Sequence, residues 1–164
     1  MIFLLKWIGA VFLLLAGATA GYLESKKLHD RVTRLKNFCI FLDNAATEVS
    51  YEGMPVEEIC MRHGKSLDFM APLFVALKAG EPFPQAWKKA EASPVLCEED
   101  RELLSQFGEG FGASDTQGQL NHCSLCGSLT KKTLLKAEED EKKKGKLYRM
   151  LGLFGGAAAA LLLC

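Results

Sequence analysis

The sequence lacks an excess of either charge, since 20 Lys and Arg residues stand against 20 Asp and Glu. Proteins that bind nucleic acid usually carry a basic excess, so this balance argues against that class. Six cysteines among 164 residues are too few for a disulfide-dense secreted scaffold. With 49% hydrophobic residues the chain is not disordered, and its length fits one modest domain.

Signatures of common enzymes are also missing. The chain has no Ser/His/Asp grouping, no phosphate-binding loop of the Walker type and no dinucleotide-binding glycine motif. Glu48, Glu57 and Glu58 could be imagined as an acid pair, but polar faces of amphipathic helices explain them more simply. We therefore expect a protein without enzymatic activity, catalytic residues, cofactor or metal.

Charged residues are absent from the segment between Trp7 and Leu23. Together with the apolar residues before Lys6, this segment approaches the roughly 20 residues that cross a bilayer. Trp7 and Tyr22 bracket it, as interfacial aromatic residues do. We predict an uncleaved transmembrane helix over residues 1–23. The alternative is a signal peptide cleaved after Ala20. The basic sequence ESKKLHDRVTRLK that follows opposes export.

A second uncharged segment, MLGLFGGAAAALLLC, ends the sequence and follows the basic stretch KKKGKLYR. At about 1.5 Å per residue it is somewhat short for the ~30 Å hydrocarbon core. Leu147 and Tyr148 extend it, and Arg149 can reach the headgroups. We predict a C-terminal transmembrane helix over residues 149–164. A buried core helix is the alternative.

Both predicted spans contain glycines four residues apart, Gly17 with Gly21 and Gly152 with Gly156. Small residues at this spacing let two membrane helices approach closely. We expect these four glycines to bring the first and last helices into contact.

Basic residues flank the predicted spans on one side only. They are Lys26, Lys27, Arg31, Arg34 and Lys36 after the first span and Lys142, Lys143, Lys144, Lys146 and Arg149 before the second. Because basic loops stay in the cytoplasm, residues 24–148 are predicted to be a cytoplasmic domain on a two-helix hairpin, with both termini across the membrane.

The charged middle of the chain has helical periodicity. In residues 24–52 apolar side chains recur at steps of three and four. They are Leu28, Val32, Leu35, Cys39, Leu42, Ala46 and Val49. Further helices are expected over VEEICMRH, over PQAWKKAEA and over ELLSQFGEGFG opened by Glu98. No segment alternates with the period of a strand, so the fold class is all-α, a helical bundle between two membrane helices.

Helix caps and one kink are predicted from single residues. Ser66 is expected to cap a helix over SLDFMAPLFVALKAG, in which Pro72 is an internal kink. Ser114 or Asp115 is expected to cap the last helix, which could run unbroken into the second span.

His122, Cys123 and Cys126 form the only segment that resembles a reactive site. A Cys-x-x-Cys pair can be a redox centre or half of a zinc site. Here it falls inside a predicted helix, and Cys97 or His63 would have to complete a metal site. We interpret the pair as small packing residues. The alternative function is an exported redox or metal-binding protein that uses Cys123 and Cys126.

The segment LLSQFGEGFGASDTQGQL is unusually rich in glycine. Gly108, Gly110 and Gly112 each cost about 1 kcal/mol relative to Ala in a helix interior. This cost suggests close backbone contact or a bend, and Phe107 and Phe111 would be buried together. We interpret the segment as a packing hinge that can face a partner. The acidic strip Glu98–Glu109 could complement a basic partner, or be a solvated face.

The whole layout resembles the stage III sporulation protein AB family of endospore-forming Firmicutes. The resemblance rests on Gly9 and Gly21, on RVTRLKNF, on Glu48, Tyr51 and Pro55 in TEVSYEGMPVEE, and on Trp87 in QAWKKA. Its most specific part is a motif of seven residues. These are Gln106, Phe107, Gly108, Glu109, Gly112, Asp115 and Gln119.

The resemblance implies an organising role in the channel complex between mother cell and forespore. It implies a domain that faces the mother-cell cytoplasm and is similar to the platform proteins of type II secretion and type IV pilus systems. The implied partners are the stage III sporulation protein AA ATPase, other membrane subunits of the channel and membrane lipid.

Overall fold

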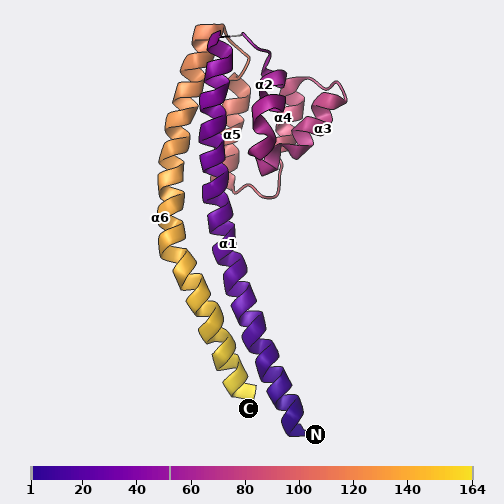
Figure 1. Cartoon of the computed structure of the whole chain (residues 1–164), viewed down its shortest axis with the longest axis vertical. Coiled ribbons are helices and arrows are strands. Elements are labelled where there is room, and N and C mark those ends of the chain that lie inside the picture. The colour runs from indigo at the N-terminus through magenta and orange to yellow at the C-terminus, as the bar shows by residue number, and fades with distance from the viewer. Residues whose placement is uncertain (1, 52, 164) are drawn as a thin grey trace. The chain divides into compact units, whose positions relative to one another are not determined.

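The computed structural model describes residues 2–51 and 53–163, and within these it contains helices and no strand. The prediction of an all-α protein is therefore confirmed. Figure 1 shows the helices in chain order. They are α1 Ile2–Tyr51, α2 Val56–His63, α3 Ala71–Lys78, α4 Phe83–Glu91, α5 Glu98–Gly110 and α6 Thr116–Leu163.

The chain divides into two compact units. The pair unit consists of α1 as far as Val32 and α6 from Leu135 onward. The bundle unit consists of Thr33–Leu134. It therefore contains the C-terminal part of α1, all of α2 to α5, and the N-terminal part of α6. The predicted domain limits at residues 24 and 148 remain predictions.

The pair unit exposes large apolar side chains. Ile8, Phe12 and Leu15 on α1 are 59–74% exposed, and Leu151 and Phe154 on α6 are 57% and 63% exposed. Among the described residues, one helix, within Ile8–Tyr51, is long and apolar enough to cross a membrane, and only 11% of its apolar window is buried. The buried core of a soluble protein would hide such residues, so α1 is consistent with a membrane anchor.

The transmembrane helix predicted over residues 149–164 stays a prediction. The described part of α6 contains no apolar stretch that is long enough to cross a membrane. Cys164 and the side chains of residues 162 and 163 lie outside the described residues, as does the side chain of Trp7, which was expected at the first membrane interface.

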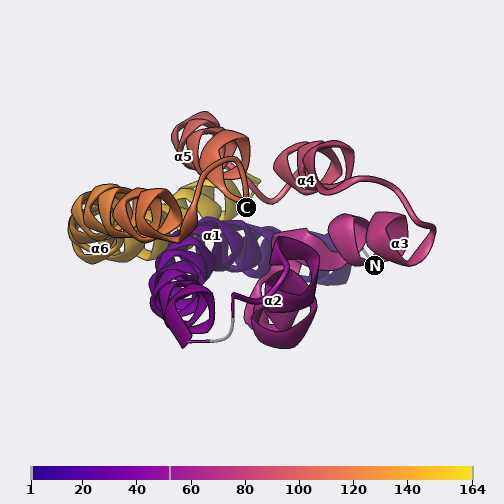
Figure 2. The same cartoon turned by 90° about the horizontal axis from the view of Figure 1, so that it is seen from above.

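The bundle unit is built on the apolar face of α1. Leu35, Leu42 and Val49 are at most 4% exposed, as the periodicity predicted, and Phe38 and Phe41 extend the same face. Figure 2, a view along the long helices, shows α2 to α5 as separate short rods. Burial of these large apolar side chains is the main stabilising contribution to such a bundle.

Glycine, proline and aspartate set the helix ends in the bundle unit. Gly53 has a φ of 56° and follows the end of α1, a conformation that favours glycine. The N–H of Gly118 donates to Oδ1 of Asp115 at 2.9 Å, so Asp115 rather than Ser114 caps α6. The prediction that this last helix runs unbroken is confirmed, since α6 continues to Leu163.

The expected helix from Ser66 was wrong at its start. Gly64–Ser66 and Asp68–Met70 form two short 3-10 turns, separated by Leu67 in an extended conformation, and α3 begins only at Ala71. Pro72 therefore lies in the first turn of α3, where its missing N–H costs no helical hydrogen bond, and it does not kink the helix.

Candidate functional site

The centre of the bundle unit is a contact between Trp87 on α4 and Gly108 on α5. Trp87 is 1% exposed, and its indole Nε1–H donates to the carbonyl oxygen of Leu104 at 2.9 Å. The indole ring lies over the backbone at Gly108, where any added methyl group would overlap its Cδ1, Nε1 and Cγ atoms. Glycine at this position therefore allows α4 to pack directly onto the backbone of α5.

Phe107, the neighbour of Gly108, is the hub of an aromatic cluster. Its ring centroid lies 5.2 Å from that of Trp87, 5.6 Å from that of Phe38 and 4.6 Å from that of Phe111. Offset and edge-on aromatic pairs at these distances add stabilisation beyond the area that they bury. This part of the predicted motif therefore joins α1, α4 and α5.

Gly110 allows a side chain of α6 to pack directly onto the backbone of α5. The imidazole of His122 occupies the space that a side chain at Gly110 would need. His122 Nε2 lies 3.0 Å from the carbonyl oxygen of Phe107, and the two rings stack with centroids 5.8 Å apart. In the sequence His122 stands out only as a neighbour of two cysteines, so its contacts with Gly110 and Phe107 were not predicted.

Three further motif residues, Gly112, Asp115 and Gln119, lie in the turn from α5 to α6 or in the first turn of α6. Gly112 has a φ of 86°, and a methyl group on it would lie 3.0 Å from Cγ1 of Val56. Asp115 caps α6, and Gln119 donates from Nε2 to the carbonyl oxygen of Ser114 at 3.1 Å. These residues therefore fix the direction in which α6 leaves the aromatic cluster.

Gln106 and Glu109 lie on the opposite side of α5 and are exposed. Glu98 and Glu102 precede Gln106 at steps of four on the same helix and are also exposed. Burial, and then the nearby carboxylate of Glu109, raise the pKa of Glu91 on α4. We call Glu98, Glu102, Gln106 and Glu109 the acidic face of α5.

The two cysteines of the CxxC pair are buried in the bundle unit. Cys123 is 2% exposed and Cys126 is 1% exposed. Burial raises the pKa of Cys123 to about 11 and also raises that of Cys126. A thiol that stays protonated is a poor nucleophile and a poor metal ligand. Among the described residues, no three His, Cys, Asp or Glu side chains are grouped so as to hold a metal.

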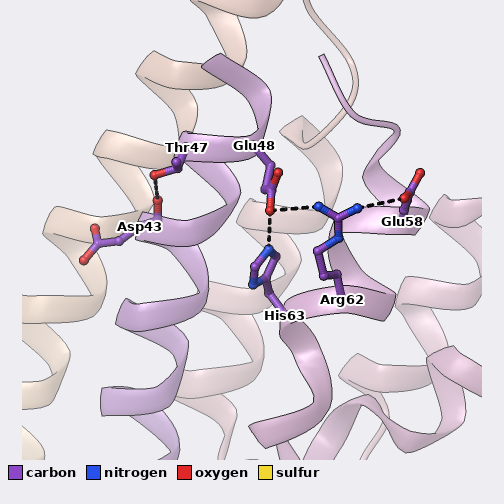
Figure 3. A network of polar contacts seen from close by, with 6 residues as sticks. All are labelled: Asp43, Thr47, Glu48, Glu58, Arg62 and His63. Atoms are coloured by element: carbon purple, nitrogen blue, oxygen red, sulfur yellow. Dashed lines mark hydrogen bonds and ion pairs between the residues drawn. The ribbon is translucent and has the colours of Figure 1, made fainter. Parts of the chain in front are cut away.

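A polar network joins the end of α1 to α2 (Figure 3). Oε1 of Glu48 lies 2.6 Å from Nε2 of His63 and 3.4 Å from Nη1 of Arg62, and Arg62 also contacts Glu58 at 3.1 Å. The hydrogen bond with His63 holds the pKa of Glu48 below its ordinary value. No local pattern indicates this pairing, because Glu48 and His63 are 15 positions apart in the sequence with a turn between them.

In the pair unit, the structure brings Gly17, Gly21, Gly152 and Gly156 together. A methyl group on Gly17 would lie 2.5 Å from the carbonyl oxygen of Gly152 and 2.8 Å from Cα of Gly156. A methyl group on Gly21 would overlap the carbonyl oxygen of Tyr148. Backbone meets backbone at these positions, which only glycine permits.

Comparison of the sequence with known proteins identifies the family that it matches. The family model described as stage III sporulation protein AB matches residues 6–164. The stage III sporulation protein AB of Bacillus subtilis (strain 168) is 27% identical over 170 positions, which cover 98% of this chain and 99% of that protein. No solved structure matches the chain.

Proposed function

Because the chain belongs to the stage III sporulation protein AB family, we propose that it is a membrane-anchored platform of the sporulation channel between mother cell and forespore. In this proposal it acts by binding partners and catalyses no reaction. It docks a cytoplasmic ATPase of the secretion type, the stage III sporulation protein AA ATPase, and contacts other membrane subunits of the channel.

The proposed anchor is a hairpin of two membrane helices. The exposed apolar side chains of α1 and α6 in the pair unit support it, because hydrocarbon is the medium in which such surfaces are stable. The close approach of Gly17 to Gly152 supports pairing of the two helices within the membrane.

The proposed orientation places the bundle unit in the mother-cell cytoplasm. It rests on the basic residues that flank both spans on the same side, since such residues are retained in the cytoplasm. The alternative, an exported protein that uses Cys123 and Cys126, finds no support in the burial and raised pKa values of these thiols.

We propose that the ATPase binds the acidic face of α5. Glu98, Glu102 and Glu109 are exposed, and among the described side chains none of them pairs with a cation. The other side of the same helix is fixed on Trp87 by Gly108 and Phe107. A rigid helix that presents like charges without partners is suited to dock a basic surface, which would also steer the encounter.

Binding of the purified ATPase to the full-length protein in detergent tests this proposal. Glu102→Lys/Glu109→Lys reverses two charges on the acidic face and is expected to weaken binding at least about tenfold, mainly through slower association. Asp43→Lys/Glu57→Lys makes the same change in net charge at exposed positions elsewhere in the bundle unit, and it should retain binding. Equal effects of the two variants, or no effect of either, would contradict docking on α5.

A further inference from the structure

The five basic residues at positions 142–149 of α6 fall into two sets, one paired with carboxylates and one unpaired. Lys143 pairs with Glu139, and Nζ of Lys144 lies 2.9 Å from Oδ1 of Asp140, both four residues back on α6. The charges of these two lysines are therefore balanced within their own helix. Ion pairs at this spacing are common on solvated helix faces.

The second set consists of Lys142, Lys146 and Arg149, at steps of four and three along α6. This spacing places them on one face of a continuous helix, and all three are exposed. Among the described side chains, none of the three pairs with a carboxylate. Nε of Arg149 donates to the carbonyl oxygen of Gly145 at 3.2 Å, which leaves the Nη groups for another acceptor.

The same face of α6 becomes apolar in the next turn. Met150 and Leu153 lie four residues beyond Lys146 and Arg149 and are 46% and 53% exposed. Three cations without counter-charges therefore stand directly before an exposed apolar surface. This is the order of groups in an anionic phospholipid, whose charged headgroup precedes its acyl chains.

The corresponding surface of α1 differs. Lys26 and Lys27 there line a concave surface that also contains Glu24 and Asp30. Nζ of Lys27 lies 2.6 Å from Oε1 of Glu24. The carboxylates would repel an anion, so the unbalanced positive charge is strongest on α6.

We propose that Lys142, Lys146 and Arg149 form a binding site for the headgroup of an anionic phospholipid, whose acyl chains lie against Met150 and Leu153. The inference rests on the proposed membrane anchor and adds to it a specific lipid. The lysines bind the phosphate as point charges, and the planar guanidinium of Arg149 can donate two parallel hydrogen bonds to it. Such a site fixes α6 at the depth where its cations meet the headgroups.

The test compares two double variants of the full-length protein in nonionic detergent. Lys142→Gln/Lys146→Gln removes two unpaired charges, whereas Lys143→Gln/Lys144→Gln removes two paired charges from the same segment. Both change net charge equally and keep good helix formers. Native mass spectrometry measures the apparent dissociation constants of added phosphatidylglycerol and phosphatidylcholine.

Lys142→Gln/Lys146→Gln is expected to weaken phosphatidylglycerol binding about thirty-fold, and Lys143→Gln/Lys144→Gln less than about threefold. Phosphatidylcholine should bind more weakly than phosphatidylglycerol to the wild type and respond to neither variant. Equal losses in both variants would show attraction by overall charge alone and overturn the site. Equal binding of the two lipids to the wild type would also overturn it.

A separate measurement distinguishes failure of the site from failure of the anchor. The wild type and both variants should stay in the membrane pellet after extraction with alkaline carbonate. A wild type that remains in the pellet but does not prefer phosphatidylglycerol would refute the lipid site and leave the proposed function intact. Release of the wild type into the supernatant would contradict the anchor and the lipid site together.

Discussion

At the residue scale, the contact between Trp87 and Gly108 explains why the interior of α5 contains a glycine. The indole ring occupies the volume of a side chain at that position, and its N–H is used by the carbonyl oxygen of Leu104. The ring is also held by Phe107 and by Phe83, whose centroid lies 5.6 Å away. Trp87 cannot move aside without disturbing these contacts.

Gly108→Ala is therefore expected to destabilise the protein. Overpacking of a core costs about 1–3 kcal/mol, which exceeds the gain of at most about 1 kcal/mol from replacing a helical glycine with alanine. The matched control is Gly127→Ala in α6, where an added methyl group meets no atom within 4 Å. We expect the control to raise the free energy of unfolding by up to about 1 kcal/mol. Urea unfolding of both variants in detergent measures the difference, and a stabilised Gly108→Ala protein would refute the contact.

The pairing of Glu48 with His63 makes a prediction about pH. A carboxyl whose pKa is lower in the folded chain stabilises the fold at pH values above its unfolded pKa, here near 4.5. This stabilisation is lost as pH falls through the lower folded pKa. Glu48→Gln should therefore lose less stability than the wild type when pH is lowered from about 5 to 3.

Urea midpoints followed by circular dichroism at several pH values measure this effect. The control is Glu57→Gln, an exposed carboxyl of α2 outside the network of Figure 3, which should retain the wild-type slope. An unchanged acid slope in Glu48→Gln would show that the pair with His63 does not form in solution.

At the element scale, the pairing of α1 with α6 in the pair unit can be tested by a disulfide. A methyl group on Gly145 would lie 3.3 Å from Oγ of Ser25, so the side chains of cysteines at these two positions would be in contact. Ser25→Cys/Gly145→Cys, in a chain whose native cysteines are replaced, should oxidise readily. Protection of both thiols from a large maleimide reports the bond.

Adding Gly152→Leu to that double-cysteine chain should strongly reduce disulfide formation. The new side chain would collide with the carbonyl oxygen of Gly17 and Cα of Gly21, which are backbone atoms that cannot yield. Gly155→Leu is the control, because an added methyl group there meets nothing within 4 Å. Equal oxidation with both leucines would contradict close packing of the two helices.

Residues at the helix ends were sufficient to predict where most of the helices begin or end. Gly53, Pro55 and the acidic first turn of α5 mark helix ends through their own backbone or charge, so the predicted limits agree with the structure. The start of α3 was mispredicted because Leu67 adopts an extended conformation between two 3-10 turns. Arg34 on α1 binds Asp68 there through two hydrogen bonds of 2.8 Å, a tertiary interaction that no local pattern reveals.

In the candidate site, too, some residues could be predicted from the sequence and others could not. The glycine content of LLSQFGEGFGASDTQGQL singled out this segment, and the spacing of Phe107 and Phe111 predicted that both are buried, as they are. The seven motif residues themselves were identified through the family resemblance. The partners Trp87 and His122 could not be predicted, because they lie on other helices and have no fixed distance in sequence from Gly108 or Gly110.

At the scale of the whole molecule, we propose a helical domain in the cytoplasm that is held by two membrane helices. The family match spans nearly the whole chain, and α1 has the length and apolarity of a span. The second span and the orientation are proposals that depend on the basic segments beside the two apolar ends. Docking on α5 and the lipid site on α6 both require this topology.

The measurement that tests this topology most directly is labelling with a membrane-impermeant maleimide. Lys143→Cys is made in an otherwise cysteine-free chain, and a second chain carries a single cysteine after a short Ser-Gly extension beyond residue 164. We expect the cysteine at position 143 to react only after cell lysis, and the C-terminal cysteine to react in intact cells. Reaction of the cysteine at position 143 in intact cells would contradict the cytoplasmic domain, and protection of the C-terminal cysteine until lysis would contradict the second span.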